Sequence, residues 1–415
     1  MNKKILTLTF VSLFSLPNAY AIDLGHNVTI KGFGTAGLVY SDNNQADFLS
    51  NNYLNPRGAG RTEDVSVVND SKLGLQMDWQ ATSRLSFTAQ AVSKQDPSNS
   101  WVPELQWAFA KFKIVPDLDI RAGRIRPAIY MLSDTLDVNY ANPWVRPPVE
   151  FYSQNPFTHI EGVDLLYRLQ TGPVNWLIQP FYGNSQISLI DNMSLTAKNL
   201  VGVNIVGSIN DFTLRAGYTY TSVTANIPDL EMAKLGLQSL CPVDPVACSQ
   251  LAALDPTNKA TSFSSVGASW DNGRYFLSGE FGYRSSTSLI PETFSGYISG
   301  GGRFGKFTPY ATYSQAYNNS PTSFSGGSGP YGGYTNQIVN AVLVDNPMDQ
   351  NTKTLGLRYE LFTNIALKAQ LDLIDTSTKN GQVGSGGGYF RNKTSSFDNS
   401  GYSINLFSTS VDFIF

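Results

Sequence analysis

The sequence predicts an all-β protein, a transmembrane antiparallel β-barrel of about 16 strands with one loop folded into its interior. Three observations predict this fold class. The chain begins with the pattern of a secretory signal peptide, short segments in the rest alternate apolar and polar residues, and no later apolar run approaches the roughly 18 residues of a membrane helix. Because unpaired backbone groups are too costly inside a bilayer, only helices and closed barrels can cross it, and this sequence favours the barrel.

The first residues indicate export. Lys3 and Lys4 precede the apolar run Ile5–Leu16, and Ala19-Tyr20-Ala21 supplies the small residues of a cleavage site. A buried or membrane helix is the alternative, but the run is too short to span a bilayer comfortably. We therefore expect residues 1–21 to be a signal peptide and residues 22–415, which contain no linker or break in composition, to form one barrel domain.

The composition agrees with this class. The hydrophobic share is 41% and the charged share only 15%, whereas about 25% charged residues are usual in soluble proteins. Gly (36), Tyr (21) and Phe (24) are abundant. The many tyrosines and phenylalanines are typical of the aromatic girdles that a membrane barrel carries at the membrane interfaces. The net charge of −3 lacks the basic excess of nucleic-acid-binding proteins. We expect outer-membrane lipid and lipopolysaccharide as surroundings and no nucleic acid partner.

Strands are predicted where side chains alternate. Between Lys72 and Trp79, Leu73, Leu75, Met77 and Trp79 share one face and polar residues or glycine share the other. The same alternation recurs in Arg84–Gln90, Phe212–Tyr220, Lys353–Leu361 and Ile365–Leu373. A soluble sheet with one buried face would show the same pattern, so the connections must decide.

The connections alternate between short and long. Short turns are predicted near residues 81–82, 115–117, 171–173, 210–211, 271–273, 305–306 and 363–364. Longer polar segments are predicted at about 41–69, 95–102, 125–159, 184–198, 223–260, 285–290, 318–351 and 376–400. Seven turns and eight long loops give sixteen strands with both termini on the short-turn rim. We expect Gly401–Phe415 to pair with Val28–Tyr40 and close the sheet.

One long loop differs from the others. The segment Arg124–His159 contains five prolines, which exclude a central strand or a long helix, yet it is rich in large apolar residues. Long ordered loops of this kind are usually functional, and we expect this one to fold into the barrel and narrow its lumen. Charges at the narrowest section act on passing solutes. The candidate residues of the constriction are Arg124, Arg126, Asp134, Asp137, Arg146 and Glu150, and those of the inner wall are Lys72, Arg84, Arg121, Arg215, Arg284 and Arg358.

The sequence offers little for catalysis or metal binding. Cys241 and Cys248 are the two cysteines, and in an oxidising compartment they are expected to form one local disulfide. His26 and His159 are the two histidines, and neither stands in a motif with a nucleophile. We therefore expect neither an enzyme nor a cofactor or metal site.

Two motifs and the last residue resemble the Gram-negative outer-membrane porins. Asp70-Ser71-Lys72-Leu73-Gly74-Leu75 is similar to their second-strand motif, with Lys72 in place of the usual arginine. Ala122-Gly123-Arg124 resembles the end of their fifth strand, and Phe415 resembles their terminal aromatic residue. The Pro-Glu-Phe-Gly signature of the enteric general porins is absent from the loop.

The resemblance implies a trimer of sixteen-stranded barrels in the outer membrane of a Gram-negative bacterium, crossing it many times with periplasmic termini. It implies passive diffusion of small hydrophilic solutes and ions through a water-filled channel. Two alternatives stay open: a substrate-selective channel of the same architecture, for sugars or small organic anions, and a surface-binding barrel that does not conduct.

Overall fold

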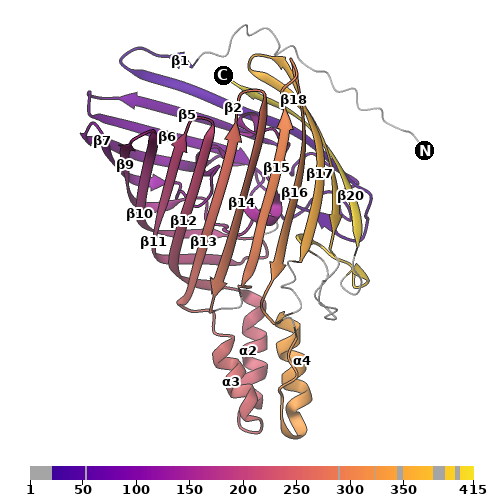
Figure 1. The fold of residues 1–415 in the computed structure, drawn as a ribbon. Helices are drawn as coiled ribbons and strands as arrows, with labels where there is room; N and C mark the ends of the chain where they lie inside the picture. Colours follow the sequence, from indigo (N-terminus) through magenta and orange to yellow (C-terminus); the bar gives the residue numbers. More distant parts are fainter. Residues whose placement is uncertain are drawn as a thin grey trace.

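The computed structural model describes residues 21–51, 54–287, 290–321, 323–343, 349–376, 388–397 and 402–415. The predicted signal peptide therefore lies almost wholly outside the described residues and stays a prediction. Within them, sixteen long strands form one closed antiparallel sheet, as the sequence predicts (Figure 1). The strands are β2 (Val28–Ser41), β5 (Lys72–Gln80), β6 (Leu85–Lys94), β7 (Glu104–Val115), β8 (Leu118–Ile125), β9 (Ile160–Thr171), β10 (Val174–Ser188), β11 (Ser194–Ile209), β12 (Phe212–Asn226), β13 (Lys259–Asp271), β14 (Tyr275–Ser286), β15 (Thr293–Gly302), β16 (Phe307–Asn318), β17 (Gln350–Phe362), β18 (Ile365–Asp375) and β20 (Ser403–Ile414).

The first and last long strands close the barrel. β2 pairs with β5 on one side and with β20 on the other, in the register Tyr40 opposite Phe407. This is the predicted pairing of the two ends of the chain, and it leaves the sheet without an open edge. The short strands β1 (Ile22–Asp23) and β4 (Val65–Ser66) add to β2. Outside the barrel sheet, β3 (Asp47–Phe48) pairs with β19 (Phe390–Arg391) and joins two of the long loops.

The two faces of the sheet differ as the alternation requires. Apolar side chains on the outer face are half exposed, for instance Leu75 (50%), Leu214 (63%) and Leu355 (58%). Inward neighbours such as Gln90 and Asn204 are polar and covered by other parts of the chain. An apolar outer surface of this extent fits a hydrocarbon solvent rather than water.

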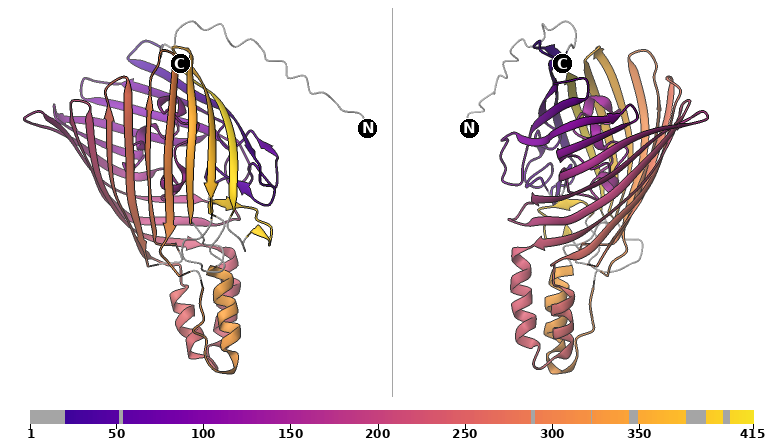
Figure 2. Two further views of the ribbon diagram at one scale, coloured as in Figure 1. Left: turned by 45° about the vertical axis from the view of Figure 1, so that its right-hand side comes forward. Right: turned by 90° about the vertical axis from the view of Figure 1, so that its left-hand side faces the viewer.

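The two rims also differ (Figures 1 and 2). One rim carries the short turns and the C-terminus, and the seven turns fall where the sequence predicts them. The other rim carries the long loops and a bundle of helices that projects from the barrel, namely α2 (Pro228–Leu240), α3 (Pro245–Ala253) and α4 (Gly332–Leu343), the last preceded by the 3-10 turn η3 (Gly329–Tyr331). None of the helices of the described residues is long and apolar enough to cross a membrane.

Two features of this rim differ from the sequence prediction. The segment predicted as the loop 184–198 is mostly a hairpin, because β10 continues to Ser188 and β11 starts at Ser194. The buried side chains of Leu195 and Ala197 pack against the barrel interior and hold the hairpin there. The polar composition of this segment was therefore not sufficient to predict a loop. The helices were missed in the predicted loops 223–260 and 318–351. Leu230, Leu237 and their helix-spaced apolar neighbours after Pro228 were the signal that could have found α2.

Candidate functional site

The predicted inner loop lies inside the barrel. It runs from residue 126 to residue 159, between β8 and β9, and contains the 3-10 turns η1 (Ser133–Thr135) and η2 (Asn139–Ala141) and the single helical turn α1 (Val149–Tyr152). Gly123 stands before it with φ +129° and so close to the backbone of the neighbouring strand that a Cβ would lie 2.3 Å from the Ala108 carbonyl oxygen. Only glycine fits there, and the chain leaves β8 for the lumen two residues later, after Ile125.

Cationic side chains of the wall bind the backbone of this loop. Each of them donates hydrogen bonds to loop carbonyl oxygens that would otherwise lie in the barrel without partners. The pairs are Arg215 Nη2 to Ala128 O (3.0 Å), Arg284 Nη1 to Gln154 O (2.7 Å), Arg358 Nη1 to Asn142 O (2.9 Å), and Lys368 Nζ to both Asn139 O and Trp144 O (2.7 Å each). Three of the predicted wall residues, Arg215, Arg284 and Arg358, therefore hold the loop in place.

Asp137 joins the loop to the wall on the other side of the barrel. Its carboxylate accepts a hydrogen bond from Lys94 Nζ (3.0 Å), pairs with Arg126 of the same loop, and lies 4.0 Å from Lys72 Nζ. Burial alone would raise the pKa of Asp137, but the charges of Lys94, Arg126 and Lys72 outweigh it and hold the pKa well below its usual value. Asp137 therefore stays ionised at any pH at which the barrel is expected to work.

Arg146 forms the most extensive contact. The buried guanidinium donates to both carboxylate oxygens of Asp70 (2.9 and 2.6 Å), to Asp372 of β18 (3.0 Å) and to the Ser408 hydroxyl of β20 (2.6 Å). Two carboxylates and a planar fork of donors make a geometry that lysine could not reproduce. One side chain thus fixes the inner loop, the first long loop and two wall strands together.

Glu150 is buried, and the side chains that donate hydrogen bonds to its carboxylate are neutral. It accepts hydrogen bonds from Ser314 Oγ (2.7 Å), Gln350 Nε2 (2.7 Å) and the Thr352 hydroxyl. Burial raises the pKa of Glu150 above its usual value, although these hydrogen bonds act in the opposite direction. Glu150 holds α1 against β16 and β17 and is no solute-facing charge.

Aromatic residues complete the attachment. Tyr130, Phe151 and Tyr152 of the loop pack against one another and against Phe263 and Tyr297 of the wall, with ring centroids 5.0 to 6.1 Å apart. Trp144 is also buried, and its Nε1 lies within hydrogen-bond distance of the Ser299 (3.1 Å) and Thr312 (3.0 Å) hydroxyls. These rings anchor the loop to the wall.

One stretch of the loop remains open to the interior. Residues 126–130 and most of 142–154 are buried, whereas residues 131–141 are mostly part-exposed and Asp134 is exposed. Asp134 lies close enough to Arg121 for the two charges to interact, and Arg121 Nε itself donates to Asp164 (2.9 Å). Loop residues 131–141 and the wall around Arg121 therefore border the part of the lumen that the loop leaves free.

Two predicted residues lie elsewhere. Arg124 is on the outer face of the barrel, where its Nε donates to Glu161 (2.6 Å), because the paired neighbours Ile125 and Ile160 point inward and the alternation turns Arg124 outward. Arg84 is exposed in the turn before β6, since the strand starts one residue later than predicted. The placement of Arg124 in the constriction and of Arg84 on the wall was wrong.

The described residues hold no cluster of three or more histidines, cysteines or carboxylates that could bind a metal ion. Burial lowers the pKa of His159 to about 4, with the nearby charge of Arg124 acting in the same direction, so the ring is neutral at pH 7. Cys241 and Cys248 form a disulfide between α2 and α3, away from the loop.

Solved structures share this architecture. No protein-family model matches the sequence, and no curated protein matches it. OmpF of Salmonella typhi, in complex with daunomycin, superposes with a TM-score of 0.56 at 14% identity over 95% of this chain and 100% of that one. The anion-selective porin from Comamonas acidovorans gives 0.53 at 12% identity over 94% and 99%. OmpT of Vibrio cholerae, in a trimer form, gives 0.52 at 10% identity over 94% and 99%.

Proposed function

The chain has the fold of the Gram-negative sixteen-stranded outer-membrane porins, and from this premise we propose that it forms a water-filled channel for passive diffusion of small hydrophilic solutes and ions. The observation that carries the proposal is the division of the inner loop. Most of the loop is tied to the wall by buried charges and rings, whereas Asp134 is exposed and several of its neighbours within residues 131–141 are part-exposed toward the interior. A loop held this firmly at mid-barrel defines a narrow section of constant shape.

In this proposal the candidate residues have two different tasks. Asp134 borders the narrow section and acts on passing ions, and Arg121 lies beside it with its charge paired to Asp164. Arg126, Asp137, Arg146 and Glu150 fix the position of the loop, as do the wall residues Lys72, Arg215, Arg284 and Arg358. Net ion selectivity then depends on the few charges that remain in contact with water, because buried ion pairs are largely neutral toward a solute.

A second candidate is a substrate-selective channel for sugars or small organic anions. The burial of the loop over residues 142–154 favours it, since a loop that occupies so much of the interior leaves a narrow passage. We further propose that the protein is a trimer in the outer membrane, with its short-turn rim and both termini in the periplasm. The shared fold and the trimer form of the Vibrio cholerae protein support this.

Planar-bilayer recording of the folded protein tests the proposal. We expect single-channel currents that rise linearly with salt concentration and a reversal potential in a salt gradient that shows weak selectivity. Saturable current, blocked by one solute at low concentration, would favour the selective channel. Absence of any conductance from folded protein would reject both and favour a non-conducting barrel.

A further inference from the structure

A large cavity lies at the mouth of the barrel on the helix-bearing rim. Its volume is about 830 Å³, within the range of small-molecule sites. The inner loop forms its floor through Phe157, the wall forms its side through Val223, and α4 reaches it through Ile338. We call this cavity the vestibule. A solute that enters from the helix-bearing rim meets it before the inner loop.

The lining of the vestibule is largely apolar. Met193, Ile227 and Ile338 line it and are part-exposed, so a solute can cover them. Leu195, Leu200 and Val223 of the wall also line it but are at most 9% exposed. Apolar side chains of the inner loop and of α2 continue the same surface. Hydrophilic solutes gain nothing from such a lining, whereas a solute with an aromatic or alkyl body does.

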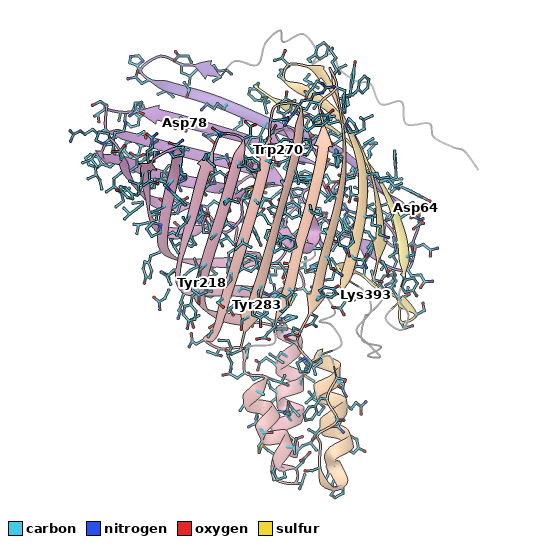
Figure 3. The ribbon with its side chains drawn as sticks, in the orientation of Figure 1. Asp64, Asp78, Tyr218, Trp270, Tyr283 and Lys393 are labelled. Carbon is cyan, nitrogen blue, oxygen red and sulfur yellow. A yellow bond between two sulfur atoms is a disulfide. The ribbon has the colours of Figure 1, made fainter. Side chains whose placement is uncertain are left out.

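Charges at the vestibule are mostly positive. Among its described lining residues, Arg284, Arg391 and Lys393 are cations and Asp191 is the carboxylate. A further guanidinium and one carboxylate lie beside them, because Arg61 Nη1 donates to the carbonyl oxygens of Asn392 (2.8 Å) and Lys393 (3.1 Å), and Asn392 Nδ2 donates to Asp47. Figure 3 shows Lys393 at the rim from which the helices project. These groups have contacts within the protein, but their charge still attracts an anion at the mouth.

We propose that the vestibule is a binding site for an amphipathic organic anion, a carboxylate with an aromatic or short alkyl body. The apolar body packs against Ile227 and Ile338, and the carboxylate lies toward Arg391 and Lys393. The inference rests on the proposed function, since it names the solute class that the channel concentrates at its entrance.

Equilibrium binding to the folded full-length protein tests the proposal with four probes: benzoate, acetate, benzyl alcohol and benzylammonium. Titration calorimetry in detergent is suitable, because it does not depend on conduction. We expect benzoate to bind at least tenfold more tightly than each of the other three. Equal affinity for benzoate and benzylammonium would overturn the proposal.

Two variants separate the two parts of the site. The double variant R391Q/K393Q should weaken benzoate binding at least threefold and leave benzyl alcohol unchanged, whereas Ile338→Thr should weaken both. The matched control R274Q/K306Q removes two cations from the short-turn rim and should change nothing. If the double variant does not fold, as shown by loss of the β-sheet circular dichroism signal, Lys393→Gln alone replaces it. Unchanged benzoate affinity in the folded variant, or an equal loss in the control, would reject the site.

The same probes distinguish failure of the site from failure of the channel. Conductance without benzoate binding would reject the vestibule site and retain the channel. Benzoate binding with the expected variant effects but without conductance would reject the channel and retain the site.

Discussion

Two long loops of this barrel are ordered by opposite means. The loop 126–159 folds inward and depends on the wall, which supplies the donors for its carbonyl groups and the partners for its buried charges. The loop 227–258 projects outward and is ordered outside the barrel, with prolines at the first positions of both helices, a disulfide and a small apolar core that it shares with α4. We call α2, α3 and α4 together the outer region. The comparison teaches that damage to the inner loop should reach the channel, while damage to the outer loop should remain local.

Asp244 illustrates the self-sufficiency of the outer region. Its carboxylate caps α3 through the backbone N–H of Val246 (3.0 Å) and accepts hydrogen bonds from Ser328 (3.0 Å) and Thr335 (2.6 Å) of the neighbouring loop. The hydrogen bond from Thr335 is the main cause that lowers the pKa of Asp244, and the hydrogen bonds from Val246 and Ser328 act in the same direction. The contacts that hold α3 to α4 at this point involve no barrel strand.

The largest effect is expected from Arg146→Ala. The change leaves the buried carboxylates of Asp70 and Asp372 without their cation, and loss of one partner of a buried ion pair costs about 3–5 kcal/mol. The loop should loosen, so that single-channel conductance rises and becomes noisy and the melting temperature falls. The control is Arg303→Ala, which breaks an exposed pair with Asp271 and should cost at most about 1 kcal/mol. Equal effects of the two variants would contradict the assigned role of Arg146.

A smaller, pH-dependent effect is expected at Glu150. Because burial raises its pKa above the unfolded value, Glu150 takes up a proton on folding, and its contribution to stability is present at low pH and lost as the pH rises through the folded pKa. Asp137 adds no slope between pH 5 and 7, since its pKa is depressed and it is ionised in both states there. The melting temperature of the wild type should therefore rise from pH 7 toward pH 5 relative to that of Glu150→Gln. Parallel curves for the two proteins would show that Glu150 does not titrate in this way.

Removal of the disulfide should act on the outer region alone. In C241S/C248S the constraint between α2 and α3 is lost, which for a short loop is worth about 2–3 kcal/mol of local stability. We expect faster proteolysis within residues 227–258, with conductance and barrel melting unchanged. A change in single-channel conductance would show that the two regions are coupled.

The smallest effect is expected from Arg84→Gln. Its side chain is exposed in a turn of the short-turn rim, so conductance, selectivity and stability should all remain within error of the wild type. A clear shift of the reversal potential would mean that this turn belongs to the ion path.

The strand alternation predicted the barrel well because each residue of a strand has only two possible faces, and the turns fixed where the strands end. The inner loop was predictable as a place, from its prolines, but its contacts were not. Arg215 and Lys368 are far from the loop in sequence, and their role as donors to its carbonyl groups depends on the closed barrel. Arg124 shows the limit most clearly, since the alternation along β8, which turns Ile125 inward, decides its face and charge alone does not.

The most direct measurement of the central claim is modification of a cysteine at position 134 during single-channel recording. The variant is Asp134→Cys, prepared with Cys241 and Cys248 replaced by serine. A bulky anionic thiol reagent should lower the conductance and shift the reversal potential in one direction. A cationic reagent should shift the reversal potential in the opposite direction. Thr82→Cys in the same background, at the short-turn rim, should show neither change. If the reagents attach at position 134 and the current stays the same, the ions do not pass between the inner loop and the wall around Arg121.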